Sequence, residues 1–327
     1  MVQSCSLIDD DLTNCGYNYK MVYKLRLITN MQTELDEVFH EEADLPVRNE
    51  IERYFAPVFS DMAHDVDISF YKQPEDKRTF YKQDVIDNNR SEYVFYLPVE
   101  NYENLAVANI EDNDVAYMAD TLSSIGSRLT LPEGARFTSQ RTGLFTSRLS
   151  MEIKDTVGDQ EFESMLYMAN CASVLVLDTT GSNIDIVRSE VLGTADEFLV
   201  NDSSYSYIRG VVVDAEPITP SLTAASRRMP AESAKSFPMC LAAVTFPSTD
   251  VADAEGNYWK IAVYAELPDG KITETILAIK EPLNAGDLQV IIAKLNPDGS
   301  VTPINTSEVG ASVTLDWKEG GTYSPVI

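Results

Sequence analysis

The stretch NYWKIAVYAELPDGKITETILAI, residues 257–279, places a turn signal between two apolar runs. Both runs are rich in β-branched and aromatic side chains, which favour strands. In the turn, Pro268 presets a φ angle, Asp269 hydrogen-bonds locally and Gly270 accepts a positive φ. The stretch therefore predicts a β-hairpin.

Runs of the same composition recur through the second half of the chain, and a second turn signal lies at Asn296–Gly299. Regular short strands with hairpin turns and no helices between them predict an antiparallel β-sandwich. The small, polar stretch 221–236 predicts an exposed loop. The further runs are CASVLVLDTTG (171–181), YSYIRGVVVDA (205–215), FPMCLAAVTFPS (237–248), DLQVIIAKL (287–295) and ASVTLDW (311–317).

The first half combines strands with a helical excursion. In YKMVYKLRLITN, residues 19–30, Tyr23, Leu25 and Leu27 alternate with two basic residues, which predicts a half-buried strand. Apolar residues then recur at helical spacing through 34–59, where Pro46 suits the first turn of the second of two helices. Alternating strands return at 65–72, 91–99 and 103–110.

The polar region 121–143 has no clear period and predicts a long loop with a few short strands. We place the end of the first domain shortly after it, near Ser150. The predicted organisation is a tether over 1–15, a β-sandwich with a helical insertion over 16–150, and a second β-sandwich over 151–327.

The composition excludes several classes of protein. With 52 acidic and 25 basic side chains, the net charge is −27, which repels phosphate backbones, so we expect no nucleic-acid partner. No run approaches the roughly 18 apolar residues of a membrane-spanning helix.

The sequence has few side chains suited to metal binding or nucleophilic catalysis. The only histidines, His40 and His64, lie in acidic stretches and predict surface residues. There is no HExxH, CxxC, GxSxG or phosphate-binding loop, so we expect no enzyme, no cofactor and no metal. Cys171 and Cys240 lie in apolar runs, where buried thiols are favoured over a cross-strand disulfide. Cys15 has no obvious partner.

The amino terminus, MVQSCSLIDDDLTNC, resembles a bacterial lipidation site. Val2 and Ser4 stand where lipoprotein processing needs an aliphatic and a small residue, which makes Cys5 the candidate for lipidation. Lipidation requires a signal peptide upstream of these residues. The alternative is that Cys5 is an incidental free thiol. The acidic residues after it, with Asp9–Asp11 at their centre, predict a polar tether.

Two regions resemble the lipidated anchor and minor subunits of Bacteroides-type (type V) fimbriae, which are related to fimbrillins. They are CSLIDDDLTNC (5–15), running into the strand at 19–30, and NAGDLQVIIAKLNPDGSVTPINTSEVGASVTLDW (284–317). The second is similar to the closing strands of fimbrillin-like domains, although those usually have Tyr where this chain has Leu288.

The resemblance implies two tandem transthyretin-like β-sandwich domains and a surface-exposed lipoprotein, held in the outer membrane by a lipid on Cys5. It implies a non-enzymatic anchor that ends assembly by accepting a strand from a fimbrial shaft subunit. We expect the acceptor edge near Tyr23, Leu25 and Leu27. The alternative is a surface glycan-binding lipoprotein, for which the candidate sugar platform is Tyr205, Tyr207, Tyr258 and Trp259.

Overall fold

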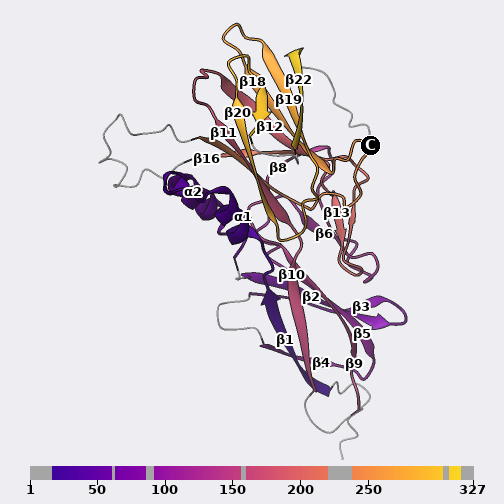
Figure 1. The fold of residues 1–327 in the computed structure, drawn as a ribbon. Coiled ribbons are helices and arrows are strands. Elements are labelled where there is room, and N and C mark those ends of the chain that lie inside the picture. Colours follow the sequence, from indigo (N-terminus) through magenta and orange to yellow (C-terminus); the bar gives the residue numbers. More distant parts are fainter. Residues whose placement is uncertain are drawn as a thin grey trace, which may run out of the picture.

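The computed structural model describes residues 17–60, 63–85, 92–155, 160–219, 238–304 and 309–317. Strands dominate it and gather into sheets of seven, six, five and four strands (Figure 1). The prediction of a mainly-β protein with a small helical insertion is confirmed. No helix in the described ranges has the length and apolar character that crossing a membrane would need.

The seven-stranded sheet forms an amino-terminal sandwich because it curls back on itself. Phe95, near one end of the strand order, contacts Phe70 and Phe80 at the other, with ring centroids 5.3 and 5.4 Å apart. The corner between the two layers is β9–β10, which pair over only two residues each. In spatial order the strands are β3 (Lys77–Val85), β2 (Asp65–Gln73), β5 (Asn101–Ala108), β9 (Phe145–Glu152), β10 (Gln160–Met168), β1 (Tyr17–Arg26) and β4 (Glu92–Leu97).

The five- and six-stranded sheets pack face to face as a carboxyl-terminal sandwich, with Leu175, Trp259 and Ile291 in the core between them. The five-stranded sheet runs β16 (Glu216–Ile218), β17 (Met239–Thr245), β11 (Cys171–Asp178), β20 (Leu288–Leu295) and β21 (Val301–Pro303). The six-stranded sheet runs β22 (Val309–Trp317), β19 (Ile272–Ile279), β18 (Trp259–Glu266), β12 (Asp185–Leu192), β15 (Val212–Asp214) and β8 (Arg136–Thr138).

The predicted hairpin at 257–279 is confirmed as β18 and β19. Gly270 has a φ of +79° and donates its N–H to the carbonyl of Leu267, which closes the turn. Most strand pairs are antiparallel as expected, but β1–β10, β11–β20 and β15–β8 are parallel. Each parallel pair joins strands far apart in the sequence, where no hairpin turn sets the direction.

The helical insertion is confirmed as α1 (Met31–Val38) and α2 (Leu45–Phe55), with a short 3₁₀ turn at Glu42–Asp44 between them. Pro46 lies in the first turn of α2, as predicted. Leu35 and Ile51 of these helices share a core with Val174 and Val290 of the five-stranded sheet. The helices therefore cover the outer face of the carboxyl-terminal sandwich, beside β11 and β16 (Figure 1).

The short strands β6 (Tyr117–Ala119), β7 (Arg128–Thr130) and β8, in and just before the polar region 121–143, do not pair with the seven-stranded sheet. The four-stranded sheet runs β14 (Ser204–Ser206), β13 (Glu197–Leu199), β7 and β6, and β8 joins the carboxyl-terminal sandwich. The predicted division near Ser150 falls inside β9, and the first sheet continues to Met168. The sheets thus interleave across the predicted boundary. The tether over 1–15 and the predicted loop at 221–236 lie outside the described residues.

Candidate functional site

The predicted acceptor strand β1 lies inside its sheet. It pairs with β10 from Tyr19 to Arg26 and, on its other side, with β4 from Tyr17 to Val22. Within the described ranges no strand pairs with that second side beyond Val22. Tyr23 and Leu25 belong to this last part of β1, and Leu27 follows it, half-buried against the core. Whether these residues form an acceptor edge stays a prediction.

The outer strand of the same layer is β4. Its inward side chains, Tyr93, Phe95 and Leu97, are buried, whereas Val94 and Tyr96 are 61% and 65% exposed. One side of β4 pairs with β1, and among the described residues its other side pairs with no strand. An edge strand with exposed apolar side chains is a template for pairing with another chain.

Side-chain contacts, and no backbone hydrogen bonds between paired strands, join β4 to β3, the strand at the other end of the sheet order. Phe80 of β3 contacts Phe95, and the Lys82 ammonium lies 5.5 Å from the centre of the Tyr93 ring. In the part of the chain that the structure describes, the layer β10-β1-β4 has three strands, whereas the layer β3-β2-β5-β9 opposite has four. A further strand beside β4 would make the two layers equal.

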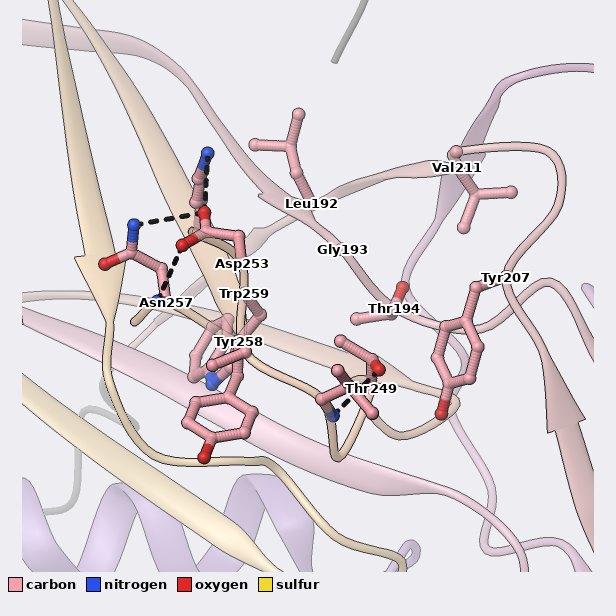
Figure 2. Close-up of a pocket in the computed structure, with 14 residues that line it drawn as sticks. Leu192, Gly193, Thr194, Tyr207, Val211, Thr249, Asp253, Asn257, Tyr258 and Trp259 are labelled. Atoms are coloured by element: carbon pink, nitrogen blue, oxygen red, sulfur yellow. Dashed lines mark hydrogen bonds and ion pairs between the residues drawn. The ribbon is translucent and has the colours of Figure 1, made fainter. Parts of the chain in front are cut away.

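A second candidate site is a pocket of about 430 Å³ formed where β12, β18 and two loops of the carboxyl-terminal sandwich meet (Figure 2). Tyr207, Tyr258 and the exposed Val251 line it. Trp259 also lines it but is only 1% exposed, and its indole N–H donates to the carbonyl of Glu281 at 3.1 Å. The pocket is therefore mainly apolar.

The polar groups of this pocket are few. Thr194 is 3% exposed, and its Oγ1 has no hydrogen-bond partner among the described residues. At the rim, the Asp253 carboxylate lies 3.7 Å from the Lys260 ammonium. Hydrogen bonds from the backbone N–H and the side-chain amide of Asn257, together with Lys260, lower the pKa of Asp253. The rim thus carries a carboxylate that stays ionised at neutral pH.

Three of the four aromatic residues proposed as a sugar platform line this pocket, but they do not form a flat exposed surface. Tyr207 is half-buried and donates its hydroxyl to the carbonyl of Ser248 at 2.8 Å, and burial raises its pKa to about 12. Tyr205 lies apart, with its ring packed against Phe198 at 4.8 Å.

The structure also describes two of the four cysteines and both histidines. Cys171 and Cys240 are buried free thiols, as predicted, and burial raises the pKa of both. His40 and His64 are exposed. Among the residues described, no group of three His, Cys, Asp or Glu is placed to hold a metal ion. Cys5 and Cys15 lie outside the described residues.

Sequence reasoning missed the exposed edge at Val94 and Tyr96. The run SEYVFYLPV was predicted as a strand, and it has apolar residues on both faces. Two apolar faces in a short strand are a signal of burial on both sides or of a partner. The sequence alone does not separate these cases because it does not show which strands flank β4.

Comparison with known proteins shows the family of this chain. A model described as Mfa2, the fimbrillin-A associated anchor proteins Mfa1 and Mfa2, matches residues 43–320. The chain belongs to this family. The resemblance predicted from the sequence is therefore confirmed, and family membership supports a role as a fimbrial anchor that associates with other fimbrial subunits at the cell surface.

Solved structures share the fold. A candidate adhesin from Bacteroides ovatus aligns with a TM-score of 0.54 at 10% identity, covering 94% of this chain and 99% of its own. The fimbrial anchor protein Mfa2 from Porphyromonas gingivalis gives 0.50 at 8% identity, covering 92% and 99%. A candidate polysaccharide-binding protein from Bacteroides thetaiotaomicron gives 0.51 at 12%, covering 89% and 99%. No curated protein matches the chain.

Proposed function

We propose that this protein is the non-enzymatic subunit that anchors a fimbrium to the outer membrane and ends its assembly by accepting a strand from a shaft subunit. Family membership supports the anchoring role. The strand-accepting role rests on one observation: among the described residues, no strand pairs with the outer side of β4, in a layer that has one strand fewer than the layer opposite. The donated strand would pair with β4, one strand outward from Tyr23 and Leu25 of β1.

The energetics of strand addition fit an anchor that must hold its load. A donated strand of about ten residues makes several backbone hydrogen bonds, each contributing ~1 kcal/mol net. Each apolar side chain that it buries contributes ~1.5 to 3 kcal/mol more. On the outer face, Val94 and Tyr96 would gain cross-strand neighbours. The sum corresponds to very slow dissociation without a covalent bond.

Attachment to the membrane would come from lipidation of Cys5. Acyl chains bind a bilayer with ~0.8 kcal/mol for each buried methylene, and stable anchoring takes more than one chain or a second signal. A protein with a net charge of −27 has no electrostatic attraction to anionic lipids, so the lipid would have to supply the affinity. The acidic residues after Cys5 would act as a tether between the membrane and β1.

The proposal is tested in the organism that carries the gene. In a deletion strain we expect longer fimbriae that are shed into the medium, and the wild-type gene should restore short, cell-bound fimbriae. A gene with Val94→Lys and Tyr96→Lys should fail to restore attachment because charged edge residues oppose strand pairing. Firmly attached fimbriae in the deletion strain would contradict the anchoring role.

A matched control separates the edge from general surface change. Val187 lies on β12 of the carboxyl-terminal sandwich and is about as exposed as Val94, at 54%. Val187→Lys should restore attachment as well as the wild type does. Restoration by the Val94→Lys, Tyr96→Lys gene as well would contradict the assignment of the acceptor edge to β4.

Glycan binding is the second candidate function. The pocket lined by Tyr207 and Tyr258 favours it, and one structure with the same fold is described as a candidate polysaccharide-binding protein. Retention of the purified chain on a polysaccharide column, lost in Tyr258→Ala, would support this candidate. Passage of the wild-type chain without delay would remove it.

A further inference from the structure

In the carboxyl-terminal sandwich, part of one side of β20 pairs with no strand of the described residues. One side of β20 pairs with β11 along Leu288–Lys294, but on the other side β21 pairs only with Ala293–Leu295. From Leu288 to Ile291, no strand in the described ranges pairs with that second side. The backbone groups of this short edge need other partners, because unpaired buried N–H groups are costly.

Side chains of α1 take the place of a strand there. The backbone N–H of Leu288 donates to Asn30 Oδ1 at 2.7 Å, and that of Val290 donates to Glu34 Oε1 at 2.8 Å. The two donors are alternate residues of β20, the spacing at which a strand presents N–H groups to one neighbour. Asn30 precedes α1, yet its side chain makes no capping bond to the helix. The Asn30 side chain instead accepts the hydrogen bond from the backbone of β20.

The chain before α1 is held against β20 by a close approach. Gly286 has a φ of +81°, and a Cβ built there would lie 2.2 Å from the carbonyl oxygen of Ile28. Only glycine allows this contact. The start of α1 is thus fixed at the beginning of the β20 edge, and the cleft between them is a built feature of the fold.

This cleft has a volume of about 570 Å³ and is lined by α1, β20, the segment after β19 and the first residue of β22. The carboxylates of Glu34, Glu37 and Asp287 line it, and none of the described residues that line it is a Lys or Arg. Partial burial raises the pKa of Glu34, the hydrogen bond from the Val290 N–H lowers it, and the charges of Glu37, Glu281 and Asp287 raise it further. The cleft therefore holds unfavourable like charges that a cationic side chain would relieve.

A further group in the cleft lacks a partner. Gln289 lines it, and its Oε1 is buried with no hydrogen bond among the described residues. A buried acceptor without a donor costs free energy, and a donor on an incoming chain would satisfy it. The edge, the carboxylates and this acceptor all favour an extended segment that brings N–H groups and positive charge.

We propose that the cleft between α1 and β20 is a second docking site, whose occupant is an extended segment of a partner fimbrial subunit that carries Lys or Arg. The segment pairs with β20 over Leu288–Ile291 by displacing the side chains of Asn30 and Glu34, and its cation lies beside the carboxylates of Glu34, Glu37 and Asp287. A second copy of this chain does not fit, because a net charge of −27 repels its like. The proposal rests on the proposed function for the identity of the partner.

Binding is tested on the purified full chain with two labelled octapeptides. One alternates valine with threonine and two lysines, and the other has glutamate in place of each lysine. We expect the lysine peptide to bind and the glutamate peptide to bind at least about tenfold more weakly. Equal binding of the two peptides, or binding of neither, would overturn the proposal.

Two charge reversals locate the site. Glu37→Lys places a cation in the cleft and should lower the affinity for the lysine peptide about tenfold. Glu41→Lys makes the same change in an exposed residue outside the cleft lining and should change binding less than about twofold. Equal effects of the two variants would mean that the peptide responds to net charge alone, and would also overturn the proposal.

Hydrogen exchange tests the backbone contact itself. In an Asn30→Ala, Glu34→Ala variant, the amides of Leu288 and Val290 should exchange faster, and the lysine peptide should slow them again. If the peptide binds without slowing these two amides, pairing with β20 is wrong. In the deletion strain, failure of this proposal alone would leave Glu37→Lys fully attached while Val94→Lys, Tyr96→Lys sheds its fimbriae. Failure of the proposed function would leave fimbriae attached in both.

Discussion

The two sandwiches treat their strand edges differently. In the amino-terminal sandwich, the outer side of β4 pairs with no strand that the structure describes, and β4 exposes Val94 and Tyr96. In the carboxyl-terminal sandwich, the short edge of β20 is covered by α1, and Asn30 and Glu34 hold its N–H groups. An uncovered strand edge can pair with a strand of another chain, whereas a covered edge has its backbone groups already bonded. The difference indicates that β4 is ready for a partner, whereas β20 opens only when those two side chains move.

The covering of edges extends to β17. Beyond the three residues that pair with β16, the N–H of Val244 donates to Ser139 Oγ at 2.8 Å, and its carbonyl accepts from the N–H of Gln140 at 3.0 Å. The carboxyl-terminal sandwich therefore uses side chains and loops at two places where a strand could have been added.

The largest expected effect separates the two faces of β4. Phe95→Ala should lower the free energy of unfolding by about 4 kcal/mol, because it leaves a cavity among Phe70, Phe80 and Tyr93. Tyr96→Ala, one residue along on the exposed face, should cost less than about 0.5 kcal/mol. Urea unfolding of both variants measures the difference. Similar losses would show that the outer face of β4 is already packed, and would break the contrast with β20.

The next effect concerns the covered edge. Gly286→Ala should lower the free energy of unfolding by about 3 kcal/mol, because the new Cβ meets the Ile28 carbonyl and the positive φ is strained. Gly256→Ala is the matched control, since its φ is +84° and nothing lies within 4 Å of the added Cβ. It should cost about 1 kcal/mol. Equal losses would mean that the close approach of Ile28, just before α1, to Gly286 does not contribute to the free energy of unfolding.

Carboxylates in the two sandwiches should respond to pH in opposite directions. Burial, with Asp112, Glu111 and Asp67 nearby, raises the pKa of Asp65 to about 6. Because the pKa of Asp65 is higher in the folded state, its protonation stabilises the fold. That contribution is fully present when the pH is below the unfolded-state pKa near 3.8, and it is lost as the pH rises through about 6. Asp65→Asn should therefore be more stable than the wild type by about 2 kcal/mol at pH 7.5, and equal to it near pH 4.

The contrasting group is Asp253, whose pKa is lowered by hydrogen bonds from Asn257 and Glu255. Its contribution is present above the unfolded value and is lost as the pH falls through the folded one. Asp253→Asn should accordingly be less stable than the wild type at neutral pH. Thermal unfolding of both variants between about pH 2 and pH 8 checks the two signs, because the contribution of Asp253 is lost only below its unfolded value near 3.8.

The smallest effect on stability should belong to the acceptor edge itself. Val94→Lys and Tyr96→Lys replace exposed side chains and should change the free energy of unfolding by less than about 0.5 kcal/mol each. A large loss of stability in these variants would mean that loss of fimbrial attachment reports misfolding, and would remove them as probes of the edge.

Local patterns in the sequence were sufficient for the hairpin at 257–279 and for the two helices. Gly270 marks the turn of that hairpin, and Leu35 and Ile51 mark the apolar faces of the helices. The periodicity identifies which face of a helix is buried but not what buries it. The sequence therefore did not show that α1 and α2 pack on the second sandwich.

Two of the strands that were missed carry charged residues among their apolar ones. β3 (Lys77–Val85) contains KRTFYKQ, and β10 (Gln160–Met168) carries charges on its outer face, where Glu163 pairs with Lys24. Pairing with distant strands, rather than local pattern, makes them strands. The contacts of Asn30 and Glu34 with β20 join residues more than 250 positions apart, which no local pattern reveals. The pocket at Tyr207 and Tyr258 likewise depends on loops that meet only in the fold.

The most direct test of strand acceptance is hydrogen exchange of the purified chain, with and without shaft subunits released from purified fimbriae of the deletion strain. The account predicts that amides of β4, Glu92–Leu97, become slower to exchange when the subunit binds. The Val94→Lys, Tyr96→Lys variant should show no such change. Binding of the subunit with unchanged exchange across β4 would contradict the claim that this edge accepts the donated strand.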